Sequence, residues 1–292
     1  MNENEFTPQP TKDGSYTFFS QEFQETFHSS FGAKQEARVK YIEPCAIASL
    51  ARQKSIRLLD VCYGLGYNSA AALKTIWSIN PECVVELFAL EIDANVPMAA
   101  IEHSLLAQWQ TSNAARSQVE RLLTQLSSKS LVKDEFFAGR LLLGDARQTV
   151  KLVAESGWYA DAIFLDPFSP PKCPQLWTVE FITLLRGCLA PTGKLATYSC
   201  SAAVRTALLT TGLKIASVWG AGRKSPGTIA AFEYKNIPSL SQKEQEHLAT
   251  RAAIPYRDPD LIDKPEQIIA RRKQEQQNSN METASQWRKR WL

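Results

Sequence analysis

The sequence predicts an α/β fold in which helices cover a seven-stranded, mainly parallel sheet that ends in an antiparallel hairpin. Two observations favour this class. From Ile56 onward, apolar runs of strand length alternate with helical patterns, as expected for successive β–α–β units. Between the last two apolar runs lie only residues 219–227, which are rich in Gly and Pro and too short for a crossover helix, so these two strands are expected to pair antiparallel.

The predicted strands are short apolar runs, several of which end at a polar residue. They span residues 56–61, 84–90, 140–143, 162–165, 194–198, 213–218 and 228–234. A further segment, residues 110–135, lies between the second and third strands and is predicted to be helical, with an apolar face that we expect to shape the substrate pocket. That face consists of Val119, Leu122, Leu123 and Leu126.

Length and composition suggest how the chain is divided. A chain of 292 residues accommodates one large α/β domain with extensions, since domains commonly span roughly 100–200 residues. We expect residues 1–45 to form an aromatic-rich extension that packs on the main domain, residues 46–236. Residues 237–292 form a polar, basic extension, and such a Gln-rich tail is more often solvated than bound to nucleic acid.

Charge and cysteine usage exclude several classes of protein. The formal charge of +3 permits an anionic partner without requiring one. The first residues are polar and acidic, so neither a signal peptide nor a membrane anchor is expected and the protein should be cytoplasmic. Six cysteines without a C-x-x-C pair, together with three histidines, indicate reduced thiols and no structural metal site. Nothing in the sequence indicates an obligate protein partner.

Residues 57–68 are the most informative segment, because an apolar strand is followed there by a glycine-containing turn that opens a helix. Gly64 and Gly66 lack a Cβ, so the backbone can take a positive φ and approach a ligand, while the helix start offers free N–H donors. A dinucleotide site needs a third small residue, as in G-x-G-x-x-G, but Asn68 and Ser69 stand there. The turn, with Asn68, therefore suits a nucleoside linked to an amino acid without phosphates, such as S-adenosylmethionine, or is a plain strand-to-helix connection.

Three acidic residues follow predicted strands, at the edge where open α/β sheets bind ligands. Asp60 either accepts a hydrogen bond from the cofactor's amino group or bonds the turn backbone. Glu91 either accepts from two ribose hydroxyls or is a solvated acid at a helix start. Asp145 either accepts from the adenine amine, caps the next helix, or does both.

The sharpest local signal is residues 163–171, where a buried strand delivers Asp166 into a proline-stiffened loop beside Phe168. In methyl transfer the lone pair of the nucleophile must lie opposite sulfur, so orientation supplies most of the help. Asp166 can accept an N–H from an amine next to the cofactor, and Phe168 can pack on a planar base. We rank Asp166 as orienting group above general base, because an exposed Asp near pKa 3.9 is a weak base; the alternative is a plain strand-end turn.

Three further residues are candidates for substrate contact. Trp177 either belongs to the core or forms a stacking platform. Arg223 and Lys224, in the loop between the last two strands, either contact phosphate or are solvated.

Together these segments resemble the methyltransferase half of the bacterial tRNA 5-methylaminomethyl-2-thiouridine biosynthesis family MnmC, and more closely its stand-alone relatives without the flavin oxidase half. The matching segments are residues 18–20, 25–26, 63–68, 165–170, 195–199 and 220–224, with Pro174 and Trp177. The resemblance implies a Rossmann-like class I S-adenosylmethionine-dependent methyltransferase domain over residues 46–236.

The remaining expectations follow from the function of this family. The resemblance implies methyl transfer from S-adenosylmethionine to the primary amine of 5-aminomethyl(-2-thio)uridine at the tRNA wobble position, without metal or flavin. Asp166 matches the family's active-site aspartate, and Glu91 and Asp145 match its cofactor-side acids. The chain ends soon after the hairpin, so we expect no flavin-binding half and a tRNA that arrives already carrying the amine.

Two residues depart from the family pattern, and three other functions stay open. Cys62 stands where many methyltransferases have a glycine, which is expected to tighten the cofactor site. Pro167 replaces the usual glycine, so the loop resembles the Asp-Pro-Pro-Tyr type of amino-methyltransferase. The other functions are methylation of another small-molecule or protein amine, a non-catalytic tRNA-binding module, and an NAD-linked oxidoreductase, which Ser69 and Asp145 disfavour.

Overall fold

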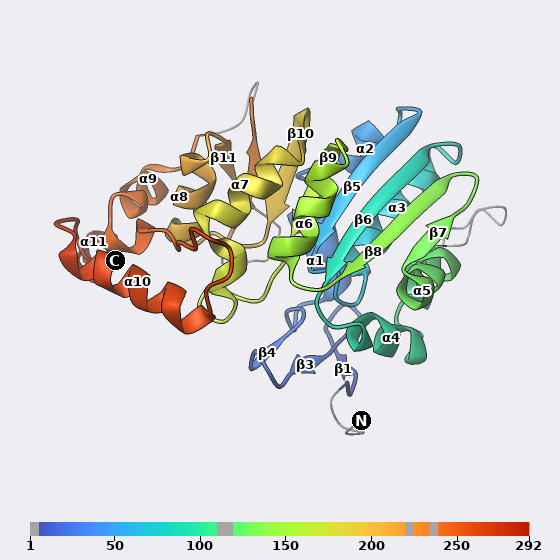
Figure 1. Cartoon of the computed structure of the whole chain (residues 1–292), viewed down its shortest axis with the longest axis horizontal. Helices are drawn as coiled ribbons and strands as arrows, with labels where there is room; N and C mark the ends of the chain where they lie inside the picture. The colour runs from blue at the N-terminus through green and yellow to red at the C-terminus, as the bar shows by residue number, and fades with distance from the viewer. Residues whose placement is uncertain (1–5, 110–118, 220–224, 234–238, 292) are drawn as a thin grey trace.

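The computed structural model describes residues 6–109, 119–219, 225–233 and 239–291, and its centre is an eight-stranded sheet of order β11-β12-β10-β9-β5-β6-β8-β7 (Figure 1). Neighbouring strands from β10 to β8 pair in parallel, whereas β12 pairs antiparallel with β10 and β11, and β7 with β8. The strands are β5 (Ser55–Val61), β6 (Val84–Glu91), β7 (Leu131–Lys133), β8 (Phe137–Leu143), β9 (Ala160–Leu165), β10 (Leu189–Thr197), β11 (Lys214–Val218) and β12 (Gly227–Ala231).

All seven predicted strands are present, and the antiparallel pairing of the last two is confirmed. The additional strand, β7, lies in the segment predicted to be helical, so that prediction is wrong for residues 131–133. Ser130 takes a left-handed φ of 58° and ends the helix, and the chain then returns along β8 with alternating exposure. Residues 110–118 lie outside the described part of the chain.

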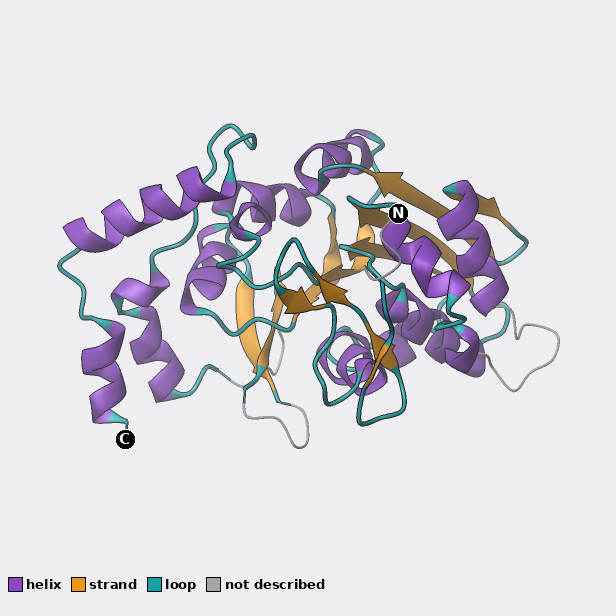
Figure 2. Cartoon of the chain, turned by 90° about the horizontal axis from the view of Figure 1, so that it is seen from below, coloured by secondary structure: helices purple, strands orange, loops and turns teal. Residues whose placement is uncertain are grey.

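Helices cover both faces of the sheet (Figures 1 and 2). On one face the core is built by the N-terminal helices and by those that follow β5, β6 and the 110–118 segment; these are α1 (Ala33–Ala37), η1 (Arg38–Ile42), α2 (Ile47–Leu50), α3 (Tyr67–Ile79), α4 (Asn95–Glu102), η2 (Ala107–Trp109) and α5 (Val119–Lys129). The helices on the other face are α6 (Ala146–Glu155), η3 (Pro174–Trp177), α7 (Val179–Gly187) and α8 (Ala202–Thr210).

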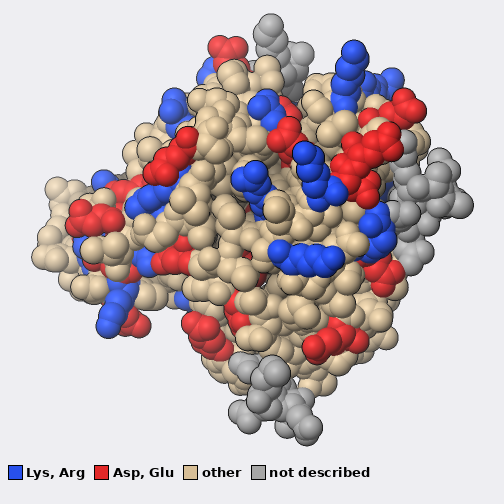
Figure 3. All heavy atoms as spheres, turned by 45° about the vertical axis from the view of Figure 1, so that its right-hand side comes forward, with Lys and Arg blue, Asp and Glu red and all other residues tan. Residues whose placement is uncertain are grey.

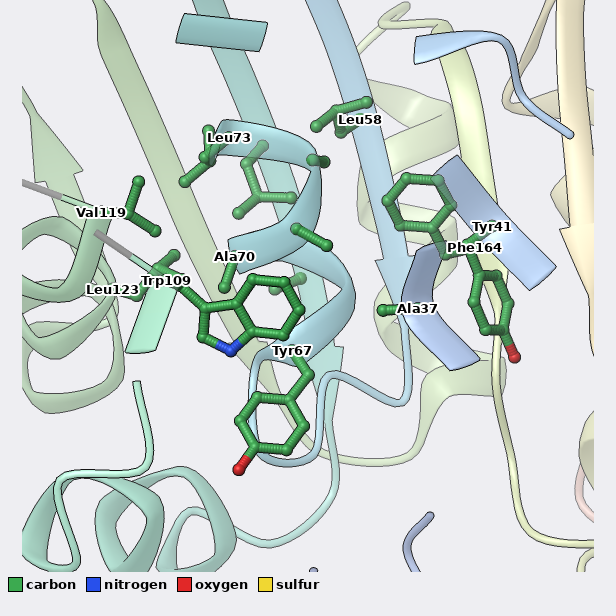
Figure 4. Packing of buried hydrophobic residues seen from close by; sticks show 14 of the residues in the cluster. Ala37, Tyr41, Leu58, Tyr67, Ala70, Leu73, Trp109, Val119, Leu123 and Phe164 are labelled. Carbon is green, nitrogen blue, oxygen red and sulfur yellow. The ribbon is translucent and has the colours of Figure 1, made fainter. Parts of the chain in front are cut away.

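The predicted apolar face of α5 is confirmed, because its four apolar residues are all buried. They pack beside α3, where the rings of Tyr67 and Trp109 lie 5.8 Å apart (Figure 4). No described residue of α5 lines the cavity discussed below, so the expectation that this insertion shapes the substrate pocket is not supported.

The N-terminal segment packs on the main domain. It forms two small hairpins, β1 (Gln9–Pro10) with β2 (Tyr16–Thr17) and β3 (Phe19–Ser20) with β4 (Glu25–Thr26), which lie beneath the main sheet in Figure 1. Phe18 and Tyr41 are fully buried. The segment therefore forms part of the same core as α3.

The C-terminal extension is folded onto the face covered by α7 and α8 (Figure 1). It contains α9 (Gln242–Leu248), η4 (Arg251–Ala253), α10 (Pro265–Asn278) and α11 (Ala284–Arg290). Ile268 of α10 is fully buried, and Arg272 donates its Nε–H to the carbonyl of Ile254 at 2.6 Å. The extension thus packs against the main domain while most residues of α10 and α11 stay exposed or half-buried, and its contact with nucleic acid is still a prediction.

Within the described ranges, no helix combines the length and apolar character needed to cross a membrane. All six cysteines are free thiols.

Candidate active site

The carboxyl ends of β5, β6, β8 and β9 meet in a cavity of about 470 Å³. Strand β5 lies between β6 and β9, so the chain leaves it on one side and later returns on the other. Such a switch point opens a crevice at the strand ends, where α/β proteins bind ligands. The strand ends contribute Cys62, Gly64, Glu91, Asp145 and Asp166 to the lining, and the N-terminal segment contributes Phe23, Glu25, Phe27, His28 and Glu36.

The glycine turn after β5 is built from left-handed backbone. Gly64 has a φ of 55° and Gly66 a φ of 79°, and a Cβ on Gly66 would meet the hydroxyl of Tyr63 at 2.6 Å. Cys62 also has a positive φ of 66°, a conformation that costs a non-glycine residue free energy. This explains why a glycine is common at that position, and it leaves Cys62 as a strained residue in the cavity wall.

Glu91 lies where the sequence predicts it, at the end of β6 and in the cavity wall. Its Oε2 accepts the N–H of Gly64 at 2.7 Å, and its Oε1 accepts those of Ile92 and Asp93 at 2.8 and 3.0 Å. Burial raises the pKa of Glu91, and these backbone donors partly offset that effect. The carboxylate thus fixes the turn while still facing the cavity.

Asp60 does not reach the cavity, so the prediction that it contacts a cofactor is not supported. It is fully buried, and its Oδ2 accepts the hydroxyl of Ser69 at 2.6 Å. Burial raises the pKa of Asp60 to about 7. Its structural role is to hold the start of α3 against β5.

Asp145 lines the cavity and also caps α6, because its Oδ1 accepts the N–H of Arg147 at 2.9 Å. The cap predicted for this residue is therefore confirmed. The Arg147 guanidinium also contacts both carboxylate oxygens, at 2.7 to 3.1 Å. A role in binding adenine remains a prediction.

Asp166 is held by two neutral donors. The hydroxyl of Tyr41 donates to Oδ1 at 2.5 Å, and the Nδ2 of Asn68 donates to Oδ2 at 2.8 Å. Burial raises the pKa of Asp166 well above its usual range, against the opposing effect of these hydrogen bonds, and the charge of Glu36 raises it further. The argument that Asp166 is exposed with an ordinary pKa is wrong, which removes the reason for ranking it as a poor base.

Two of these partners have roles that the sequence did not indicate. Asn68, predicted to bind cofactor, is almost fully buried and is not part of the cavity lining, so its amide orients Asp166 instead. Tyr41 belongs to the aromatic-rich N-terminal segment, and no sequence pattern distinguishes it from the other aromatic residues there. It lies in η1, a short π-helical turn, and π-helical turns are frequent at functional sites.

The loop after Asp166 is fastened by aromatic contacts. The ring of Phe168 stacks on Phe23 at 4.4 Å and meets Phe27 edge-on at 5.0 Å. Trp177 is fully buried and donates its Nε1–H to the carbonyl of Phe168 at 2.9 Å. Of the two alternatives for Trp177, the core is therefore the correct one, and this ring cannot offer a stacking face to substrate. The candidates for packing on a base are Phe168 and, newly, Phe23 and Phe27.

Acidic side chains dominate the described lining of the cavity, although Asp145 already pairs with Arg147. Five carboxyl groups line it, and none of the described lining residues is Lys or Arg; the five are Glu25, Glu36, Glu91, Asp145 and Asp166. Burial lowers the pKa of His28, the lining histidine, to about 4, so it is neutral at physiological pH. The cavity thus favours a cationic ligand.

Other expectations concern residues away from this cavity. Arg223 and Lys224 lie outside the described residues. Among the residues that are described, no group of three or more His, Cys, Asp or Glu side chains is placed to hold a metal ion.

Comparison with known proteins identifies the chemistry of this site. Residues 100–233 match the family described as S-adenosyl-L-methionine-dependent methyltransferase. The crystal structure of MnmC2 from Aquifex aeolicus matches with a TM-score of 0.80 and 32% identity, covering 95% of this chain and 88% of that one. The chain belongs to the MnmC-related S-adenosylmethionine-dependent methyltransferases. This confirms the resemblance and the Rossmann-like fold, and it argues against an NAD-linked oxidoreductase.

Two relatives show how far the similarity extends. An uncharacterized protein of Methanocaldococcus jannaschii is 30% identical over 272 residues, 90% of this chain and 70% of the relative. The tRNA 5-methylaminomethyl-2-thiouridine biosynthesis bifunctional protein MnmC of Ralstonia nicotianae is 28% identical over 231 residues, 77% of this chain and 34% of the relative. The chain thus spans about a third of the length of that bifunctional relative.

Proposed function

We propose that this methyltransferase moves a methyl group from S-adenosylmethionine to the primary amine of 5-aminomethyl(-2-thio)uridine at the wobble position of tRNA. The observation that carries the proposal is Asp166, a carboxyl group held by neutral donors in a cavity whose described lining has no Lys or Arg. An ammonium group would meet acidic partners in this cavity. The MnmC relatives are named for biosynthesis of this type of nucleoside, which supports tRNA as the source of the amine.

The cavity residues fit S-adenosylmethionine. Glu91 keeps acceptor capacity on Oε2, which receives one backbone N–H, and would hold the ribose hydroxyls. Ile92 beside it lines the cavity although 65% of the residue is exposed, which suits contact with a purine face. The amide oxygen of Gln175, another lining residue, is buried without a hydrogen-bond partner in the described protein and is free to take a ligand donor. When bound, S-adenosylmethionine supplies an electrophilic methyl carbon on a sulfonium.

Asp166 has two tasks in this proposal. An ammonium has no lone pair, so the acceptor must lose a proton before it attacks. Burial raises the pKa of Asp166, so this pKa lies closer to the pKa of the amine than the pKa of an exposed Asp does. One N–H of the acceptor donates to an Asp166 oxygen, which turns the nitrogen lone pair toward the methyl carbon. Because Tyr41 and Asn68 fix the carboxylate, this orientation is set before substrate arrives.

The acceptor base would lie on the aromatic cluster of Phe23, Phe27 and Phe168, which forms the apolar wall beside Asp166. The tRNA backbone requires separate basic contacts, for which Arg223 and Lys224 remain candidates. On the face shown in Figure 3, basic and acidic residues are interspersed rather than gathered into one basic patch. The proposal includes a cytoplasmic location and needs neither metal nor flavin.

Labelled S-adenosylmethionine and bulk tRNA from a strain that accumulates the aminomethyl intermediate provide the direct test. After digestion to nucleosides, label in 5-methylaminomethyl(-2-thio)uridine is the expected result. Label in a small molecule or protein instead would establish the other-amine alternative. No label at all, with S-adenosylhomocysteine binding intact, would favour a non-catalytic tRNA-binding module.

The role of Asp166 is tested with Asp166→Ala, for which turnover should fall by roughly 10² or more while S-adenosylhomocysteine binding largely survives. Asp260→Ala, at an exposed position of the C-terminal extension, is the matched control and should behave as wild type. Unchanged turnover in Asp166→Ala would remove this residue from the mechanism.

A further inference from the structure

Arg147 joins the cofactor cavity to the C-terminal extension. Its Nε lies 3.1 Å from each oxygen of Asp145, and one terminal nitrogen lies 2.7 Å from Oδ2 of the same carboxylate. The other terminal nitrogen donates to Oδ2 of Asp258 at 2.7 Å and to the carbonyl of Asp263 at 2.9 Å. One guanidinium therefore uses all its nitrogens to connect a cavity residue with residues more than a hundred positions later.

Asp258 is built into the extension as a fixed, fully buried carboxylate. Its Oδ1 accepts the N–H groups of Ile262 and Asp263 at 3.2 and 3.1 Å. Its own N–H donates to Oε2 of Glu180 on α7 at 2.8 Å. Since it is held from both sides, Asp258 can hold Arg147 in place.

The charges around Arg147 explain how its fixed position affects Asp145. Arg147 is buried and faces two carboxylates, one in the cavity and one in the extension. The side chain of Asp145 is 35% exposed, so its orientation depends on its hydrogen-bond partners more than on burial. A planar guanidinium that binds both oxygens fixes the carboxylate's rotation as well as its position.

We propose that the C-terminal extension, acting through Asp258 and Arg147, positions Asp145 and thereby sets the affinity for the cofactor. Asp258 and Arg147 are positioning residues in this inference, since neither lines the cavity. The inference rests on the cofactor half of the proposed function and is independent of the acceptor. By linkage, cofactor binding and docking of the segment around Asp258 favour each other by the same factor.

The first experiment separates positioning from stability. Asp258→Asn leaves Arg147 buried beside a neutral partner and is expected to destabilise the fold. The double variant Arg147→Met/Asp258→Asn removes both charges while a side-chain oxygen at position 258 can still accept the N–H groups of Ile262 and Asp263, and removal of both members of a buried ion pair is often neutral for stability. Its melting temperature should return toward that of wild type, while the Kd for S-adenosylhomocysteine, measured by calorimetry, should weaken by about tenfold, within the usual range of couplings between sites.

Arg257→Met is the matched control, because Arg257 is next to Asp258 and forms a more exposed pair with Glu180 at 2.6 Å. It should leave the Kd unchanged. A folded double variant with wild-type Kd would overturn the inference, as would equal weakening in Arg257→Met.

Hydrogen exchange tests the coupling from the other side. Added S-adenosylhomocysteine should increase protection of the Ile262 and Asp263 amides, which are bonded to Asp258, and the double variant should lose this response. Unchanged protection in wild type with ligand bound would refute the coupling. Wild type that fails to bind S-adenosylhomocysteine would overturn this inference and the proposed function together, whereas absence of methylated tRNA with intact binding would overturn only the proposed acceptor.

Discussion

The hydrogen bond from Tyr41 to Asp166 offers the sharpest test of the active-site chemistry. Tyr41→Phe removes one hydroxyl from a fully buried ring and leaves the packing against Phe164, at 5.8 Å, in place (Figure 4). Asp166 then keeps Asn68 as its remaining side-chain donor. The substitution therefore changes the electrostatics of one carboxyl group with little change in shape.

The size of the effect follows from the geometry. The bond is 2.5 Å long, in the range of strong O–H···O⁻ bonds, and hydrogen bonds to charged groups contribute about 1.5–3 kcal/mol. Tyr41 lowers the pKa of Asp166, so its loss raises that pKa further above the usual range. If the carboxylate is the active form, turnover near neutral pH should fall by about 10- to 100-fold, since 1.4 kcal/mol corresponds to a factor of ten.

The assay is a pH–rate profile of methyl transfer under single-turnover conditions. In Tyr41→Phe the rising limb should move to higher pH, so that activity partly recovers in alkaline buffer. Tyr67→Phe is the control, because Tyr67 is equally buried but donates to the carbonyl of Tyr16. A lower rate with an unshifted limb would show that Tyr41 only positions Asp166 and would refute the electrostatic reasoning.

Three further outcomes are expected. Cys62→Val places a β-branched residue at a φ of 66° and should destabilise the fold by about 1–3 kcal/mol in thermal denaturation; an unchanged melting temperature would refute the strain. Partial burial raises the pKa of Glu244, but hydrogen bonds, first among them that from Ser217, outweigh burial and lower it from 4.5 to about 2. Its contribution to stability is therefore complete above pH 4.5 and disappears toward pH 2. Glu244→Gln should therefore reduce the difference between the free energies of unfolding at pH 3 and pH 6, measured by urea denaturation. Trp177→Phe loses the bond to the Phe168 carbonyl and should lower kcat by about tenfold without changing the Kd of S-adenosylhomocysteine; a changed Kd with normal kcat would contradict this role.

Local patterns in the sequence were enough to predict the sheet and the cavity edge. Apolar runs located the strands because burial on both faces of a parallel sheet requires continuous apolar residues. The residues that follow those strands, Gly64, Glu91, Asp145 and Asp166, meet at one cavity because parallel strands end at the same edge. Strand β7 was missed because three residues are too few to show a period.

The missed features are contacts between distant segments. Tyr41 and Asp166 are 125 positions apart, and Arg147 and Asp258 are 111 apart, so no spacing in the sequence relates them. Burial was misjudged for the same reason. Trp177 is buried because segments far from it in the chain pack around it, and that packing cannot be read from its immediate neighbours.

The N-terminal segment makes the two halves of the cavity separable by engineering. Gly64, Glu91 and Asp145 come from the strand ends of the main domain, whereas Phe23, Phe27 and Glu25 come from one stretch of chain that precedes the sheet. Glu25 accepts the N–H of Ser169, in the loop after Asp166, at 3.0 Å. Exchange of this short stretch between relatives would therefore replace Phe23, Glu25 and Phe27 together, while Asp166 and Phe168 of the main domain would stay in place.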